Sequence, residues 1–159
     1  MDKPLVVILM GSKSDMEHSQ KIADACKGYG IEPVLRIGSA HKTAERILKI
    51  LREYETEARP KVYITVAGRS NALSGLTDGA VSAPVIACPP VSDVFGGADL
   101  YSSIRMPSGI APALVLEPAN AALLAAKILG LVDPEVCAAV MKSQMQAAEK
   151  IIQDDQALQ

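Results

Sequence analysis

The sequence contains no tryptophan, a single phenylalanine and three cysteines among its 159 residues. Because aromatic side chains are so scarce, the core has to be built from aliphatic residues and methionine, and about half of the chain is apolar, which suffices for one domain with a sizeable core. The cysteines are odd in number and lack metal-ligand spacing, which argues against a disulfide framework and a zinc site. We therefore expect a reduced, cytoplasmic protein.

An excess of charge and long apolar runs are also missing. The formal net charge is -2 and the basic residues do not cluster, which argues against nucleic acid or an anionic membrane as the main partner. No apolar run approaches the roughly 20 residues of a bilayer-spanning helix, and no charged leader precedes a signal-peptide core. These absences favour a small-molecule ligand.

Short apolar runs alternate with helical patterns along the chain, which is typical of a parallel sheet with helices on both faces. The expected strands are Leu5–Met10, Pro33–Ile37, Val62–Ala67, Pro84–Cys88 and Ala113–Leu116. The expected helices are Met16–Tyr29, Thr43–Ala58, Asn71–Gly79, Ala119–Leu129 and Pro134–Asp155. The sequence thus predicts one domain over residues 1–159, with a three-layer α/β/α fold around a central parallel sheet, flavodoxin-like or Rossmann-like.

Three segments point to contacts with other subunits. Pro89–Pro112 contains adjacent prolines and a Gly-Gly pair, so we expect mostly loop with one short helix near Ala98–Arg105, and a loop that long is usually functional or interfacial. The stretch Ala119–Leu131 has more alanine than one amphipathic face needs, which favours a buried helix in an oligomer. The polar C-terminal helix is expected to pack on a neighbouring subunit.

Three motifs follow the first three expected strands, and ligands bind at the carboxyl ends of the strands in open parallel sheets. The first, Gly11-Ser12-Lys13-Ser14-Asp15, directs unpaired backbone N–H groups and a helix N-terminus at one spot, which suits a phosphate. Ser12 and Ser14 can bind phosphate oxygens, whereas Asp15 is better suited to sugar hydroxyls or to capping the helix. The motif indicates a ribose-phosphate site, with an ordinary capped turn as the alternative.

The second motif, Ser39-Ala40-His41-Lys42, contains the best acid/base candidate of the chain. Only two histidines exist, and His41 lies in a loop at the ligand edge, where an imidazole can take and return a proton near neutral pH. Ser39 can cap the next helix or bind an anion, and Lys42 supplies a mobile positive charge. A solvated or capping role is the alternative for His41, and we interpret His18 as a partly exposed helix residue.

The third motif, Ala67-Gly68-Arg69-Ser70-Asn71, places several donors at the start of a helix. Arg69 is suited to a carboxylate, although it can also pair with an acid across an interface. Arg105 is either a second anion contact or a loop anchor. No cluster has metal-ligand spacing, and neither a Walker motif nor Gly-x-Gly-x-x-Gly is present, so metal, ATP and dinucleotide cofactors are not supported.

In this order and spacing, the three motifs resemble the PurE family of purine biosynthesis. The segments Ile86–Pro90, Ser102–Gly109 and Asn120–Gly130 continue the resemblance, which covers almost the whole chain. Class I members move a carboxylate from N5 to C4 of 5-aminoimidazole ribonucleotide (AIR), and class II members add free CO2 to C4. The resemblance implies the flavodoxin-like fold, a homo-octamer with sites at subunit contacts, and chemistry without a cofactor.

The chain departs from the class I pattern at three places. Class I has tryptophan, arginine and histidine where this chain has Met16, Lys42 and Ala72. The Ala-Gly-Arg-Ser-Asn and Cys-Pro-Pro segments instead resemble class II, including the carboxylase domain that is fused to a synthetase in animals. The resemblance therefore implies an AIR carboxylase domain without the fused synthetase. The alternatives are the class I mutase activity and a non-catalytic module that binds a ribose phosphate.

The resemblance also implies roles for individual residues. It carries Ser12 and Asp15 over as residues that bind the substrate phosphate and ribose, with Ser14 close by. It carries His41 over as the proton-transfer residue, and Lys42 as a contact to phosphate or carboxylate.

The third motif completes the expected site. We expect its residues Gly68, Arg69 and Ser70 to hold the new carboxylate or to shape the CO2 pocket.

Overall fold

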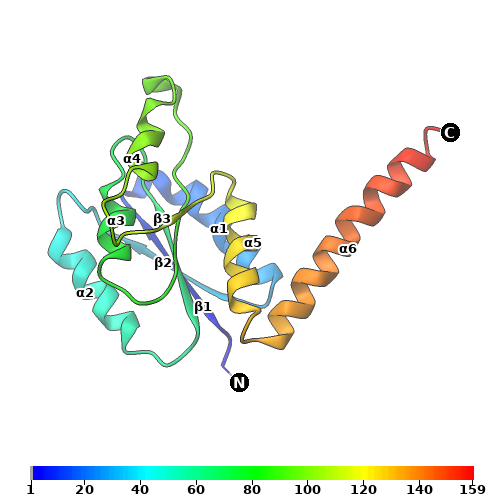
Figure 1. Cartoon of the computed structure of the whole chain (residues 1–159), viewed down its shortest axis with the longest axis horizontal. Helices are drawn as coiled ribbons and strands as arrows, with labels where there is room; N and C mark the ends of the chain where they lie inside the picture. Colours follow the sequence, from blue (N-terminus) through cyan, green and yellow to red (C-terminus); the bar gives the residue numbers. More distant parts are fainter. Residues whose placement is uncertain (1) are drawn as a thin grey trace.

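The structure is a computed structural model that describes residues 2–159. Five parallel strands form one sheet in the order β2-β1-β3-β4-β5, with helices on both sides (Figure 1). The strands are β1 (Leu5–Met10), β2 (Glu32–Ile37), β3 (Lys61–Val66), β4 (Val85–Ala87) and β5 (Ala113–Leu114). This order is that of the flavodoxin-like fold. The predicted three-layer parallel architecture is confirmed.

The central strand β1 shows why the sheet needs a helical layer on each face. All six of its residues are buried, and alternate side chains point to opposite faces. Val6, Ile8 and Met10 belong to one apolar cluster, whereas Leu5, Val7 and Leu9 belong to another. The first cluster is covered by α1 (Met16–Gly28) and α5 (Pro118–Leu129), the second by α2 (Ala44–Glu55) and α3 (Ala72–Asp78).

The remaining helical segments are short, apart from the last. They are the 3-10 turns η1 (Lys13–Asp15), η2 (Asp93–Phe95) and η3 (Ala98–Leu100), the single turn α4 (Tyr101–Ile104), and α6 (Pro134–Gln156). The helix expected near Ala98–Arg105 is therefore present as η3 followed by α4. The α2 helix ends at Glu55 rather than Ala58, because the Thr56 hydroxyl bonds the Glu53 carbonyl oxygen and closes the last turn.

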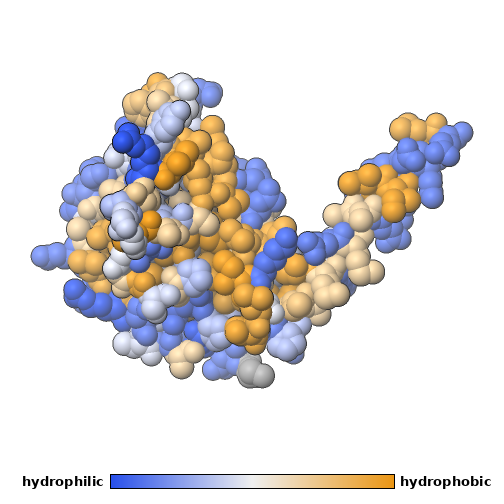
Figure 2. Space-filling model, in the orientation of Figure 1, coloured by the Kyte–Doolittle hydropathy of each residue, from blue (hydrophilic) through white to orange (hydrophobic). Residues whose placement is uncertain are grey.

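The α6 helix leaves the body of the molecule (Figure 1). Only Val136 and Val140, in its first two turns, are buried, and the rest of its length is largely exposed. Hydrophobic residues gather over α5 and continue onto the projecting part of α6 (Figure 2). No helix within residues 2–159 combines the length and the hydropathy that crossing a bilayer requires.

Candidate active site

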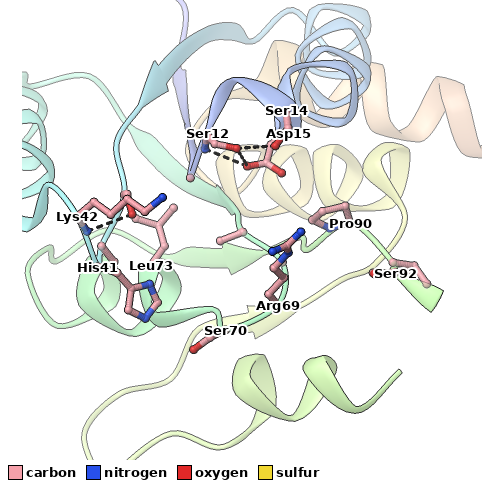
Figure 3. Close-up of a pocket in the computed structure, with 16 residues that line it drawn as sticks. Ser12, Ser14, Asp15, His41, Lys42, Arg69, Ser70, Leu73, Pro90 and Ser92 are labelled. Carbon is pink, nitrogen blue, oxygen red and sulfur yellow. Dashed lines mark hydrogen bonds between the residues drawn. The ribbon is translucent and has the colours of Figure 1, made fainter. Parts of the chain in front are cut away.

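The three predicted motifs meet at one cavity of about 540 Å³ at the carboxyl edge of the sheet (Figure 3). The cavity is lined by sixteen residues, among which are all nine residues predicted from the sequence to act in the site. These nine are Ser12, Ser14, Asp15, Ser39, His41, Lys42, Gly68, Arg69 and Ser70. Because β1 lies between β2 and β3 in the sheet, the loops that follow these three strands are neighbours in space.

The β1–α1 loop is held in a compact turn by its own side chains. The Ser12 backbone N–H donates to Asp15 Oδ2 over 3.0 Å, and the Ser12 hydroxyl lies 2.6 Å from that of Ser14 and 3.2 Å from Asp15 Oδ2. Gly11 anchors the turn, because its N–H donates to the Val66 carbonyl at the end of β3. Asp15 thus caps the loop with one oxygen, while Oδ1 makes no hydrogen bond within residues 2–159.

The β2–α2 loop presents His41 and Lys42 from a turn that Ser39 organises. The Ser39 hydroxyl accepts from the Lys42 backbone N–H at 3.2 Å, and the Ser39 carbonyl accepts from the Thr43 N–H at 2.8 Å. In Figure 3 the His41 ring is directed toward the Ser70 side of the cavity. Both His41 and Lys42 are exposed, so their side chains can reach a ligand without displacing protein atoms.

The β3–α3 loop contains Arg69, which is the one non-glycine residue of the described chain with a positive φ, at 60°. Such a left-handed conformation costs an L-residue roughly 1–3 kcal/mol and occurs mainly at functional sites. The Arg69 side chain extends into the cavity (Figure 3) and forms no salt bridge within residues 2–159. Asn71, whose amide we expected among the donors, turns inward and is buried.

A fourth wall of the cavity was not predicted. Pro90, Val91 and Ser92, which follow β4, line the cavity together with the three motifs. Ligands bind at the carboxyl ends of parallel strands, and this rule applies to the fourth strand as well. The position of the Cys-Pro-Pro segment directly after that strand could therefore have identified these residues.

His18 stands behind this fourth wall. Its Nε2 lies 3.1 Å from the Cys88 carbonyl oxygen and 3.4 Å from Cys88 Sγ. His18 is half-buried and is not among the lining residues, in agreement with its interpretation as a partly exposed helix residue. Burial lowers the pKa of His18 and raises the pKa of the Cys88 thiol to about 12, so both groups are neutral near pH 7.

Arg105 lies elsewhere. It lines a separate hollow with Tyr101, Ser102, Met106 and Pro107, so the structure does not bring it to the site.

The charges of the cavity favour an anion. Its lining contains two basic side chains, Lys42 and Arg69, against one acidic side chain, Asp15, and α1 and α2 begin at its edge. Within residues 2–159, no group of three or more His, Cys, Asp or Glu side chains is placed to hold a metal ion. The arrangement can bind an anionic ligand and move a proton beside it.

The chain is similar to known proteins over nearly its whole length. The family model described as AIR carboxylase matches residues 5–150. This chain belongs to the AIR carboxylase family. A relative from Treponema denticola named phosphoribosylaminoimidazole carboxylase is 62% identical over 156 residues, covering 98% of each chain. The crystal structure of Treponema denticola PurE superposes with a TM-score of 0.97 and 62% identity, over 99% of both chains.

Relatives whose names include this carboxylase also occur outside the bacteria. The phosphoribosylaminoimidazole carboxylase of Archaeoglobus fulgidus is 56% identical over 96% of this chain and 83% of its own length. A bifunctional phosphoribosylaminoimidazole carboxylase/phosphoribosylaminoimidazole succinocarboxamide synthetase of Drosophila melanogaster is 50% identical over 80% of this chain and 30% of its own length. The resemblance to the PurE family, and to its class II, is therefore confirmed.

Proposed function

We propose that this protein is a phosphoribosylaminoimidazole carboxylase, which adds CO2 reversibly to C4 of AIR to give 4-carboxy-AIR in purine biosynthesis, without ATP or biotin. The observation that carries the proposal is the cavity itself, in which anion-binding loops and a loop histidine meet in a chain that belongs to the AIR carboxylase family. Relatives named for this activity, at up to 62% identity over nearly the whole chain, support it.

The β1–α1 loop is the proposed place for the ribose and the phosphate. The Ser12 and Ser14 hydroxyls and the N-terminus of α1 suit phosphate oxygens, whereas the free Oδ1 of Asp15 suits a ribose hydroxyl. Ser39 holds the neighbouring turn, so that Lys42 can add its charge to the phosphate or to a carboxylate.

The carboxylation depends more on the placement of AIR beside CO2 than on chemical activation of either reactant. An aminoimidazole is an electron-rich enamine, so C4 can attack the carbon of CO2, and one C–O π pair moves onto oxygen to give the carboxylate. Holding both reactants side by side removes much of the entropic barrier, by roughly 7–11 kcal/mol in favourable intramolecular cases. Gly68, Arg69 and Ser70 are placed to hold the new carboxylate, with the Arg69 guanidinium as its counter-charge.

His41 is the proposed base of the second step. After the attack C4 still carries its hydrogen, and neutral His41 removes that proton, whose bonding electrons return to the ring and restore aromaticity. In the reverse direction imidazolium His41 protonates C4 and CO2 leaves. The exposure of His41 on the cavity side supports both the proton transfer and its exchange with solvent.

We further propose that residues 1–159 form one catalytic domain of a cytoplasmic homo-oligomer, an octamer, in which α6 packs on a neighbouring subunit. One sheet and a family match across residues 5–150 support the single domain. The exposed apolar residues of α6, with Met145 at 71% and Ile152 at 57% exposure, support the packing on another copy.

The deciding experiment supplies two substrates in parallel. Purified protein is incubated without ATP, once with AIR and dissolved CO2 and once with freshly prepared N5-carboxy-AIR, and 4-carboxy-AIR is followed by absorbance. We expect efficient turnover of AIR with CO2. Turnover of N5-carboxy-AIR alone would show a mutase, and binding of AIR without turnover of either substrate would show a non-catalytic module.

A further inference from the structure

The left-handed turn at Arg69 is held by a packing contact on one side and by a buried residue on the other. On the strand side, Gly68 packs against Pro90, since a Cβ at Gly68 would lie 3.4 Å from Pro90 Cγ. On the helix side, Asn71 is 3% exposed and is the N-cap of α3. Only Arg69 and Ser70 lie between these two fixed points, so the chain between them has little freedom.

Asn71 is fixed by partners about thirty residues further along the chain. Its backbone N–H donates to the Ser102 hydroxyl over 2.8 Å, and its side-chain Nδ2 donates to the Ser103 hydroxyl over 2.9 Å. The Asn71 Oδ1 accepts from the Ser74 N–H at 3.1 Å, which caps α3. Ser102 in turn donates to the Asp99 carbonyl at 2.7 Å. A polar network therefore joins the Arg69 loop to the η3–α4 segment.

We propose that Asn71, held by Ser102 and Ser103, is a positioning residue that fixes the left-handed turn at Arg69 and so aims the guanidinium into the cavity. The proposal rests on the proposed function, in which Arg69 binds the carboxylate of the product. A helix cap alone would need only the Asn71 Oδ1 bond to Ser74. The two bonds to Ser102 and Ser103 are made by other atoms of Asn71, and they tie the residue that follows Ser70 to a separate element.

The test compares two buried serines that differ in one respect. Ser103→Ala removes the partner of Asn71 Nδ2, whereas Ser74→Ala removes a buried hydroxyl that has no hydrogen-bond partner and leaves the Ser74 N–H in place. We expect Ser103→Ala to lower kcat/KM for AIR about tenfold, the effect of one lost hydrogen bond, and Ser74→Ala to change it less than about twofold. Ser102→Ala tests the same network should Ser103→Ala not fold.

A positioning role of Asn71 and a general effect on stability are distinguished by whether the effect of Ser103→Ala depends on Arg69. In an Arg69→Ala background we expect Ser103→Ala to cause no further loss of kcat/KM. An equal loss in both backgrounds, or equal behaviour of Ser103→Ala and Ser74→Ala, overturns the proposal. Calorimetry measures the affinity of the same variants for 4-carboxy-AIR. We expect Ser103→Ala to weaken this affinity in the wild-type background but not in the Arg69→Ala background. If the wild-type protein binds 4-carboxy-AIR but does not turn over AIR, the proposed function is refuted, and the binding measurements still test the role of Asn71.

Discussion

The carboxyl edge of the sheet and the α6 helix use apolar residues in opposite ways. Every residue of β1 is buried, and the polar loop that follows it is anchored to this core by the hydrogen bond from Gly11 to Val66. In α6 only Val136 and Val140 are buried, while Met141, Met145 and Ile152 are 57–71% exposed. The β1–α1 loop is thus anchored to the core of its own chain. The α6 helix, in contrast, leaves most of its apolar side chains exposed.

The largest effect is expected at the carboxyl edge. Replacing His41 by Asn removes the proposed base but keeps a polar side chain of similar size, so we expect kcat to fall by about 10² to 10⁴. The affinity for AIR should change little, because the loop proposed to bind the ribose and the phosphate is untouched. The size of the assembly should not change, because His41 lies outside α6. Steady-state rates, calorimetry and sedimentation measure the three quantities. A variant with near wild-type turnover and unchanged affinity would show that another group moves the proton.

The next effect concerns α6. Met145→Glu combined with Ile152→Glu places two charges on the exposed apolar stripe, where burial of each side chain in an interface would stabilise it by about 1.5–3 kcal/mol. We expect sedimentation velocity to show smaller species. The control variant, Gln146→Glu combined with Gln153→Glu, adds the same charge on another side of the helix and should retain the assembly. Equal behaviour of the two double variants would contradict packing through the stripe.

A smaller effect is expected where the β2–α2 loop leaves the sheet. Gly38 precedes Ser39, and a Cβ at this position would overlap the buried Ile47 side chain. Gly38→Ala should therefore lower the free energy of unfolding by about 1–3 kcal/mol. Gly28→Ala, at the end of α1 with open space around it, should raise it by up to about 1 kcal/mol. Urea denaturation measures the free energy of unfolding of both variants. An unchanged value for Gly38→Ala would mean that the loop is not held by the core.

The sequence predicts the carboxyl edge well because its signals are local. Each of the first three motifs follows an apolar strand directly, and strand, turn and helix start occur within a few residues of one another. The positions of Pro90 to Ser92 follow from the same rule applied to β4. The inward turn of Asn71 and the left-handed Arg69 could not be predicted in this way, because their cause is a pair of hydroxyls about thirty residues away.

The smallest effect is expected at His18, which stands behind the fourth wall of the cavity. Burial lowers the pKa of His18 below its ordinary value of 6.5, so the unfolded chain binds more protons than the folded one between these two values. The contribution of neutral His18 to the free energy of unfolding should therefore be fully present at pH 7.5. It should decline as the pH falls through about 6.5. His18→Asn should show a smaller decline between pH 7.5 and pH 5.5 in urea denaturation. Because His18 is half-exposed, the difference should be modest.

The activity of the same variant completes the comparison between the two regions. His18 joins α1 to Cys88, two residues before Pro90, and it lies far along the sequence from α6. If the carboxyl edge is positioned within one chain, His18→Asn should lower kcat/KM for AIR while sedimentation stays unchanged. A change in sedimentation with constant kcat/KM would instead assign the His18 contact to the assembly rather than to the site.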